Sequence, residues 1–387
     1  MTEGEPGEPE VWFVSNFPPP VHGVAVFNAG LVEQLRSRRI RHRIFRIGTR
    51  GSLTGTGRLG GAKAVTDVAS LAELSLASVS RLLRSQRTQP VVYFTPSQGG
   101  TAVLRDWMVA RQAHAAGIPL VAHIHGCAWL NVWRSGGWDV PIMHNVLEQC
   151  QAVICLGPTY AQAMHGATGF PCVGVNNGVK VQQAVTARTP PLREDRVELL
   201  YLSNLIKSKG LWQAAQSVGE LERRGLQVHL TCAGSWLRDA ERNQFELEFA
   251  SELDTGLIEL FGFADEHAKA ALLSRAHFFI LPTAYPLEGQ PLALIEAMAH
   301  GVVPITTTQG AIVDLLGFEQ WQHLARREHR DPGEIANTVD RLTADSAAYA
   351  ALSLRCLDHT RRFLNQERCL NAVLETLMRV AESGLQG

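Results

Sequence analysis

Short apolar segments alternate with helical patterns along the whole chain, and this alternation restricts the possible folds more than any other feature. Strands separated by helices pair in parallel, and the helices cover both faces of the sheet. We therefore predict an α/β protein with parallel sheets. The strands are expected at residues 11–16, 42–47, 91–95, 119–125, 152–157 and 172–175, and at 197–203, 228–234, 257–262, 278–283 and 302–306. The helices are expected at residues 24–38, 63–87, 101–116 and 141–150, and at 209–224, 237–254, 266–275 and 291–300.

The chain of 387 residues is long enough for two domains, each with its own core. A polar segment with two prolines, at 181–196, is the natural linker. We predict a Rossmann-like domain over 1–182 and a second one over 197–363, facing each other across a cleft. The last helical stretch, 364–387, has no strand after it and is expected to pack back on the first domain.

Composition favours a soluble globular protein. Apolar residues make up 45% of the chain, and no apolar run approaches the ~20 residues that span a bilayer. The amino end is acidic and rich in Gly and Pro, unlike a signal peptide. The seven cysteines form no CxxC pair, which indicates free buried thiols in a reducing compartment. We expect a cytoplasmic protein.

The net charge of −1 hides an asymmetry between the two halves. Residues 1–180 contain 16 Lys and Arg against 10 Asp and Glu, or +6, and the remainder contains 20 against 27, or −7. Six basic residues of the first half form one block: Arg36, Arg38, Arg39, Arg41, Arg43 and Arg46. The block is either a solvated helix end and strand edge, or a face attracted to anionic lipid or to a phosphorylated acceptor.

Ligands of open α/β sheets bind at the carboxyl ends of the strands, so the loops that follow strands are the informative ones. In the first half, the segment 15–28 has three prolines and then Gly23, where a helix amino end can approach a phosphate. His123 and His125 stand at the end of another strand and face the same way. They are either structural residues or part of a site, and no further metal-ligand spacing accompanies them.

In the second half, Lys207 and Lys209 occupy a loop between a strand and a helix. Lysines there are either solvated or aimed at a diphosphate, where an ammonium can substitute for a divalent cation. No acidic pair of the DxD kind follows a strand, which suits a metal-free site. Farther on, Glu288 lies in a Gly- and Pro-containing loop, and Glu296 lies inside the helix that begins near Pro291.

Together, the two halves, the Lys-Gly loop and the E-x7-E pattern followed by AMAHGVVPI resemble the retaining glycosyltransferases of family 4, which have the GT-B fold. The resemblance extends over nearly the whole chain, from PPPVHG to the final helix. E-x7-E alone recurs by chance. The full pattern E-G-x-P-L-x-L-x-E-A-M-A-x-G-x-x-P, with K-x-K-G at 207–210, is far more specific.

The resemblance assigns roles to individual residues. It implies that Glu288 reaches the hydroxyls of the donor sugar, that Glu296 accepts hydrogen bonds from the ribose, and that Lys209 holds the diphosphate. His125 corresponds to the histidine near the reacting sugar. The other implied donor-binding residues are Gly23, Phe263 (through its backbone, at the base), Gly289, and Gln290, Leu292 and Ala293, whose backbone N–H groups would cradle the diphosphate.

One position departs from the family pattern. The family usually has an arginine five residues before the lysine, where this chain has Asn204. A phosphate partner is therefore missing, and Lys207 is the nearby residue that would replace it.

The expected function is that of a retaining, metal-independent glycosyltransferase. It would move a hexose or N-acetylhexosamine from a nucleotide-diphosphate sugar to an acceptor hydroxyl, and the departing diphosphate would take the acceptor proton. In this family the first domain binds the acceptor. Its basic character favours a lipid-linked acceptor of surface polysaccharide biosynthesis, at the inner membrane face. No cofactor, metal or nucleic acid is expected as a partner.

Three alternatives stay open at this point. One is a soluble glycosyltransferase that acts on a small metabolite. Another is an epimerase or phosphorylase of the same architecture. The third is a non-catalytic nucleotide-sugar-binding protein.

Overall fold

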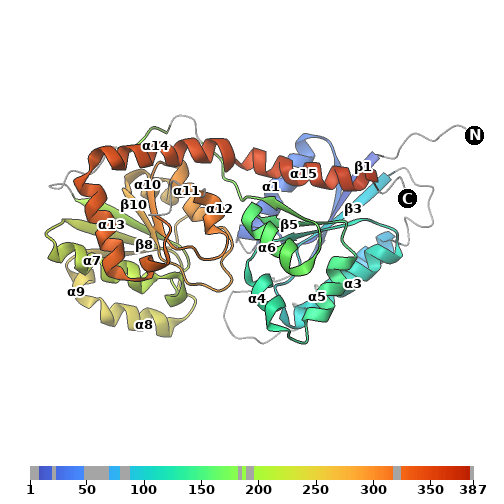
Figure 1. Cartoon of the computed structure of the whole chain (residues 1–387), viewed down its shortest axis with the longest axis horizontal. Coiled ribbons are helices and arrows are strands. Elements are labelled where there is room, and N and C mark those ends of the chain that lie inside the picture. The colour runs from blue at the N-terminus through green and yellow to red at the C-terminus, as the bar shows by residue number, and fades with distance from the viewer. Residues whose placement is uncertain are drawn as a thin grey trace, which may run out of the picture. The chain divides into compact units, whose positions relative to one another are not determined.

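The structure is a computed structural model that describes residues 8–19, 23–47, 69–78, 88–181, 185–188, 196–316 and 324–383. The chain divides into two compact units (Figure 1). Unit 1 consists of the described residues up to Asn177 together with those from Glu367 onward, and unit 2 is Gly178–Gln366. Most of the predicted linker, 181–196, lies outside the described residues. The same holds for the predicted helix 63–87, of which residues 69–78 are described and helical.

Unit 1 contains a parallel sheet of six strands in the order β2-β1-β3-β4-β5-β6. Its strands are β1 (Glu8–Ser15), β2 (Arg41–Arg46), β3 (Thr88–Phe94), β4 (Leu120–Ile124), β5 (Ala152–Leu156) and β6 (Cys172–Val175). Side chains of β1 alternate between two cores. Val11 and Phe13 join the cluster on one face of the sheet, and Trp12 and Val14 join the cluster on the other. Burial on both faces explains why this strand is apolar at every position from 11 to 14.

Helices cover both faces of this sheet. They are α1 (Gly23–Ser37), the helical residues 69–78, α3 (Val103–Ala115), α4 (Ala128–Ser135), α5 (Val140–Glu148), α6 (Pro158–Thr168) and α15 (Gln366–Ser383), with a 3₁₀ turn η1 (Gly100–Ala102) before α3. The last helix, α15, belongs to unit 1 although it comes from the far end of the chain (Figure 1). Its apolar face, including Leu370, Val373 and Leu377, packs into the same cluster as Leu31 and Leu35 of α1.

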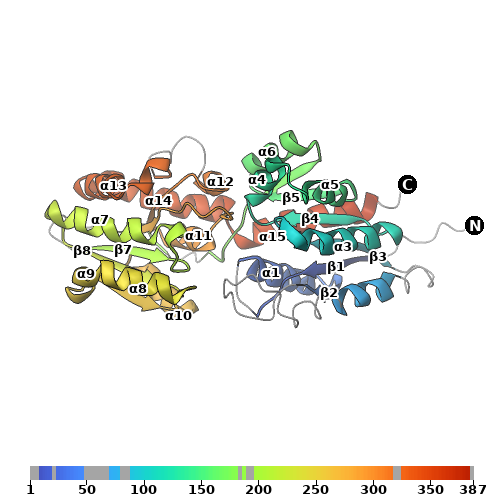
Figure 2. The same cartoon turned by 90° about the horizontal axis from the view of Figure 1, so that it is seen from below.

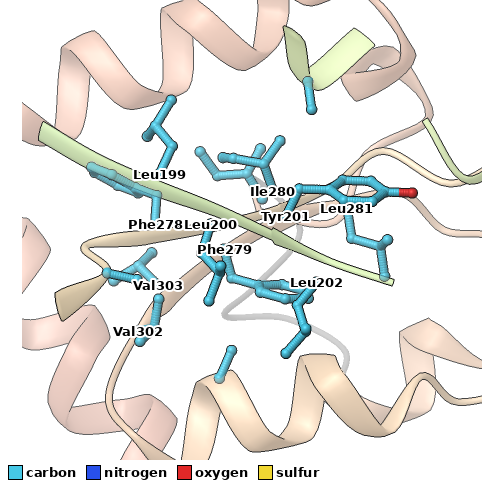
Figure 3. Close-up of a cluster of buried hydrophobic side chains, with 14 of the residues drawn as sticks. Leu199, Leu200, Tyr201, Leu202, Phe278, Phe279, Ile280, Leu281, Val302 and Val303 are labelled. Carbon is cyan, nitrogen blue, oxygen red and sulfur yellow. The ribbon is translucent and has the colours of Figure 1, made fainter. Parts of the chain in front are cut away.

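Unit 2 contains a parallel sheet of five strands in the order β11-β10-β7-β8-β9. Its strands are β7 (Val197–Leu202), β8 (Val228–Ala233), β9 (Ile258–Gly262), β10 (Phe278–Leu281) and β11 (Val303–Thr306). In the core, the apolar side chains of β7 and β10 lie side by side, with Phe278 opposite Leu199 and Phe279 opposite Leu200 (Figure 3). Both strands are buried along nearly their whole length, so each reads as a continuous apolar run.

The helices of unit 2 are α7 (Leu211–Arg223), α8 (Asp239–Glu248), α9 (Ala250–Asp254), α10 (Glu266–Arg275), α11 (Leu292–Ala299), α12 (Ile312–Leu316), α13 (Pro332–Ala344) and α14 (Ser346–Phe363), with 3₁₀ turns η2 (Lys207–Lys209) and η3 (Arg327–Arg330). Helix α13 packs beside α7 (Figure 2). The predicted helix 237–254 is interrupted at Phe249, where the backbone leaves helical values and the ring packs against Phe245 in the core. Helices α4, α6, α12, α13 and α14 were not among the predicted helices.

Residues 178–181 belong to unit 2 for a physical reason. The Val179 N–H donates to the Leu364 carbonyl at 3.0 Å, and the Gln366 N–H donates to the Val179 carbonyl at 2.9 Å. The outgoing and returning segments of the chain are thus paired, which places the unit boundary after Asn177 and at Gln366.

Candidate functional site

Three loops of unit 2 meet at the carboxyl edge of its sheet. They follow β7, β10 and β11, which are parallel neighbours. The loop after β7 is fixed to the loop after β10, because the Ala284 N–H donates to the Ser208 carbonyl at 2.8 Å. A Cβ on Gly210 would lie 2.5 Å from the Pro282 carbonyl oxygen. The two loops can therefore approach this closely only with glycine at position 210.

This approach brings Lys209 to Glu288, although 79 positions separate the two residues. The Lys209 Nζ lies 3.3 Å from each of the two carboxylate oxygens of Glu288. Thr283 Oγ1 donates to Glu288 Oε2 at 3.0 Å. Glu288 is only 5% exposed, so its charge is buried but both paired and hydrogen-bonded, as a buried carboxylate requires.

Tyr285 completes the surroundings of this ion pair. The Lys209 Nζ lies 5.2 Å from the centroid of the Tyr285 ring, within the range of a cation–π contact. Burial raises the pKa of the Tyr285 hydroxyl, and the nearby Glu288 charge raises it further. The phenol therefore stays neutral beside the carboxylate.

The loop after β11 packs directly under Glu288. Gly310 has a φ of +62°, and a Cβ there would lie 2.2 Å from the Glu288 carbonyl oxygen. The Ala311 N–H donates to the Gly289 carbonyl at 3.2 Å. The sequence motifs did not single out Gly310 or Thr283. A glycine just after the fifth strand of the sheet was the available signal, since it stands at the edge where ligands bind.

Helix α11 begins at this edge. Its N-cap is Pro291, and no side chain caps the helix end. The first backbone N–H that donates to the Pro291 carbonyl is that of Leu294, at 3.2 Å. The N–H groups of Leu292 and Ala293 come before it and have no acceptor within the helix. Gly289 and Gln290 are buried just ahead of the helix. An uncapped helix amino end suits an anion.

Glu296 lies about one turn into α11, and it is paired with a residue that sequence analysis did not single out. The Lys269 Nζ of α10 lies 2.7 Å from Glu296 Oε1 and 2.9 Å from Glu266 Oε1. Burial lowers the pKa of Lys269, but the Glu296 and Glu266 carboxylates outweigh this effect and raise it above its usual value. Lys269 is therefore charged at neutral pH.

The remaining predicted residues of unit 2 lie at the ends of strands β7 and β9. Phe263 directly follows β9, and its side chain is 76% exposed. Asn204 is exposed, and its carbonyl accepts from the Tyr201 hydroxyl at 3.2 Å. Lys207 is also exposed, and its Nζ lies 5.3 Å from the Trp212 ring centroid. The structure thus brings Lys209 and Glu288 together, whereas Lys207 contacts Trp212.

In unit 1, both predicted histidines lie beside Tyr93, which sequence analysis did not single out. The Tyr93 hydroxyl lies 2.8 Å from His123 Nδ1 and 3.3 Å from His125 Nε2. The two imidazole rings are 3.8 Å apart between centroids, and Phe27 contacts both at 5.1 Å. His123 is fully buried and His125 is partly exposed. Gly23 is exposed and begins α1.

A chain of hydrogen bonds fixes the protonation of His123. Asn28 Nδ2 donates to the Asn16 carbonyl at 3.0 Å, so Asn28 Oδ1 is left to accept from the Tyr93 hydroxyl at 3.0 Å. Because the single phenol proton is used there, the Tyr93 oxygen must accept from His123 Nδ1–H. His123 Nε2 then has no proton, and it is a buried atom without a hydrogen-bond partner. Burial, and then the neighbouring His125, lower the pKa of His123 well below its usual value.

The described residues contain no group of three or more His, Cys, Asp or Glu side chains arranged to hold a metal ion. None of the helices in that part of the chain combines the length and the hydropathy that a membrane span requires. All seven cysteines are free thiols, five of them buried, as predicted.

Solved structures share this architecture over nearly the whole chain. Anabaena Alr3699/HepE in complex with UDP aligns with 96% of this chain and 100% of its own, with a TM-score of 0.69 and 12% identity. Sucrose-phosphate synthase of Thermosynechococcus elongatus aligns with 97% and 100%, with a TM-score of 0.71 and 15% identity. The chain has the GT-B fold. The predicted fold class is therefore confirmed, and at these identities the likeness concerns the fold alone.

Sequence comparisons concern a smaller part of this GT-B chain. Residues 196–345 match the family model "Glycosyl transferases group 1". The putative colanic acid biosynthesis glycosyltransferase WcaL of Escherichia coli (strain K12) is 28% identical over 166 residues, which are 38% of this chain and 39% of WcaL. The protein of the same name from Salmonella typhimurium is 30% identical over 193 residues, or 47% and 45%. The chain thus spans less than half the length of these curated relatives. The matched family segment contains Lys209, Glu288 and Glu296.

Proposed function

We propose that this GT-B protein is a retaining glycosyltransferase that moves a hexose or N-acetylhexosamine from a nucleotide-diphosphate sugar to an acceptor hydroxyl. The observation that carries the proposal is the buried Lys209–Glu288 pair beside the uncapped amino end of α11. A cation and free backbone N–H groups at one sheet edge fit a diphosphate, and the adjoining carboxylate fits sugar hydroxyls. All of these groups lie within the segment that matches the glycosyltransferase model.

Each group has a chemical task in this proposal. The N–H groups of Leu292 and Ala293 and the ammonium of Lys209 neutralise the diphosphate as the glycosidic bond breaks. Glu288 accepts hydrogen bonds from hydroxyls of the donor sugar, and its pairing with Thr283 holds it in place. His125 of unit 1 is proposed to act near the reacting sugar.

Retention and metal independence are part of the proposal, and the same groups support them. The acceptor attacks the face that the diphosphate leaves, and a diphosphate oxygen takes the acceptor proton, so no second carboxylate is needed as a nucleophile. Lys209 supplies the positive charge that a divalent ion would otherwise bring. The reaction is then expected to continue in excess EDTA.

A lipid-linked glycan of surface polysaccharide biosynthesis is the proposed acceptor, which would place the enzyme in the cytoplasm at the inner membrane face. All six arginines of the block Arg36–Arg46 are exposed, at the end of α1, in the turn that follows it and on the edge strand β2. Several of them already contact the protein, among them Arg38, whose Nη2 donates to Asn371 Oδ1 at 2.6 Å. Arg43 pairs with Glu10 at 2.9 Å, and the Arg46 guanidinium lies 5.6 Å from the Phe17 ring centroid. The name of the curated relatives, colanic acid biosynthesis, supports a role in polysaccharide biosynthesis.

A donor screen tests the proposal. The purified protein is incubated with UDP-, GDP- and ADP-sugars, and thermal unfolding and release of the nucleoside diphosphate are measured with and without EDTA. UDP-sugars come first, because HepE has been crystallised with UDP-glucose. Ligand at ~100 times its Kd stabilises the fold by roughly 2.7 kcal/mol, an easily measured shift.

The outcomes separate the alternatives. Stabilisation with transfer to a lipid-linked glycan supports the proposal, and transfer to a small soluble acceptor supports the soluble enzyme. Stabilisation without turnover on any acceptor supports a non-catalytic nucleotide-sugar-binding protein. Donor isomerisation or phosphorolysis would identify an epimerase or a phosphorylase. Absence of any stabilisation contradicts the proposal.

A further inference from the structure

Lys269 stands where local helix electrostatics disfavour a lysine. It lies in the first turn of α10, whose N-cap Asp265 accepts from the Ala268 N–H at 2.8 Å. The amino end of a helix carries partial positive charge, so acids rather than lysines stabilise it. A cation held at this end needs compensation from outside the helix, and Glu296 of α11 provides it at 2.7 Å.

The two acids that contact Lys269 differ in their surroundings. The side chain of Glu266 is 92% exposed, whereas those of Lys269 and Glu296 are 17% and 21% exposed. A pair with an exposed partner is screened by water and contributes little, while a pair that is mostly withdrawn from water is held firmly. The contact that constrains Lys269 is therefore the one with Glu296.

This contact leaves half of the Glu296 carboxylate available. The lysine is bonded to Oε1, and within the described part of the chain Oε2 receives no hydrogen bond from the protein. Oε2 belongs to a side chain that is still partly open to solvent. An ionised oxygen fixed in this way, about one turn from the proposed diphosphate site, is a preorganised acceptor for hydroxyl donors.

We propose that Lys269 is a positioning residue that holds the Glu296 carboxylate as the acceptor for the cis-diol of a ribose, so that the site selects ribonucleoside diphosphates over their dideoxy counterparts. This inference rests on the proposed function, and it adds the residue that determines selectivity for the sugar of the nucleotide. Without Lys269, the Glu296 carboxylate loses its fixed direction. Much of the preference for the diol is then lost to the cost of ordering the side chain.

A purely structural role for Lys269 would tie α10 to α11. Those helices already have a second connection at their other ends. Arg188 Nε donates to the His300 carbonyl at 3.0 Å, and Arg188 Nη2 donates to the Leu273 carbonyl at 2.5 Å. If Lys269 only connected the two helices, its loss would not change the ratio of the affinities for the ribose and dideoxy forms of the nucleotide.

The experiment measures by calorimetry the affinity for UDP, GDP and ADP, and then for the 2′,3′-dideoxy form of the diphosphate that binds. Wild type is expected to prefer the ribose form by about tenfold or more, because the dideoxy form offers no hydroxyl to Glu296 Oε2. In Lys269→Met the ratio is expected to fall to about threefold or less. Lys269→Arg is expected to keep most of the wild-type preference for the ribose form. If Lys269→Met does not fold, Lys269→Gln is used in its place. The unfolding temperature of each variant, measured without ligand, verifies that the variant is folded.

Two further variants serve as references for the ratio of the affinities for the ribose and dideoxy forms. Glu296→Gln fixes the ratio expected when the charged acceptor is gone. Glu266→Gln removes the exposed partner of the same lysine and is expected to leave the ratio at the wild-type value. An unchanged ratio in folded Lys269→Met, with wild type selective, overturns the inference alone. A wild-type protein that binds none of the three diphosphates overturns the proposed function and the inference with it.

Discussion

Lys209 is the residue whose loss should slow the proposed reaction most. Removing one preorganised group that stabilises developing charge typically costs about 3 kcal/mol, or roughly 100-fold in rate. We expect Lys209→Ala to lower kcat by about that factor, and turnover of the donor checks it. Lys207→Ala is the matched control in the same loop. It tests whether Lys207 replaces the arginine missing at Asn204, because only then should its loss approach that of Lys209.

The two glutamates of the motif should separate binding from turnover. Glu288 is proposed to contact the donor sugar, so Glu288→Gln should lower the rate and leave affinity for the bare nucleoside diphosphate nearly unchanged. Glu296 is proposed to contact the ribose, so Glu296→Gln should weaken that affinity by about 1–3 kcal/mol. Calorimetry with the nucleoside diphosphate distinguishes them. Equal effects of both substitutions on nucleotide affinity would contradict the assigned roles.

At the scale of elements, the site depends on how closely three loops pack. Gly310→Ala would place a Cβ 2.2 Å from the Glu288 carbonyl oxygen, and the loops must move apart. We expect a loss of activity of at least tenfold and a cost in stability above ~2 kcal/mol, measured by urea unfolding. Gly225→Ala is the control, because Gly225 has a similar φ of +81° but open space around the added Cβ. It should cost about 1 kcal/mol and leave activity intact. Similar losses in both variants would mean that backbone strain, not loop contact, is responsible.

The hydrogen-bonded chain behind His125 predicts how stability changes with pH. The pKa of His123 is lowered by burial and by His125. Its unfolded pKa is near 6.5, so below that pH the unfolded chain binds a proton that the folded chain does not. The stabilisation is therefore complete above pH ~6.5 and is lost on acidification, by up to about 1.4 kcal/mol per pH unit for this one group.

Urea unfolding between pH 7.5 and 5 measures this effect. His123→Asn keeps a donor for Tyr93 and cannot take up the proton, so its stability should fall less steeply below pH ~6.5 than that of wild type. Equal slopes in the two proteins would show that His123 does not contribute.

For the whole molecule, we expect the arginine block to determine whether the protein binds to an anionic membrane surface. Each basic residue close to an anionic bilayer contributes about 1 kcal/mol, and salt screens the attraction over ~8 Å at physiological ionic strength. We expect co-sedimentation with anionic vesicles at low salt that fades by several hundred millimolar. Arg36→Gln together with Arg39→Gln, both exposed on unit 1, should weaken it. No sedimentation even at low salt would favour the soluble-acceptor enzyme.

Much of the fold could be predicted, because local patterns of apolar and polar residues indicate strands and helices. A strand that is buried on both faces of a sheet has a continuous apolar sequence, as β7 and β10 do. The helix that follows it is recognised by the helical spacing of its apolar residues. The run of strands and helices therefore predicted two parallel sheets. Helices α13 and α14 were not predicted, because they follow one another without a strand between them, which an alternating pattern does not indicate.

For the site, the sequence motifs identified three charged residues at the edge of the second sheet: Lys209, Glu288 and Glu296. What these residues contact depends on how the strands and loops pack. Lys209 meets Glu288 because β7 and β10, far apart in sequence, are neighbours in the sheet. The pairing of Glu296 with Lys269 likewise joins two helices. Periodicity and capping involve residues a few positions apart in the chain, so they indicate where strands and helices lie. Contacts between loops arise only when strand order and packing bring distant segments together.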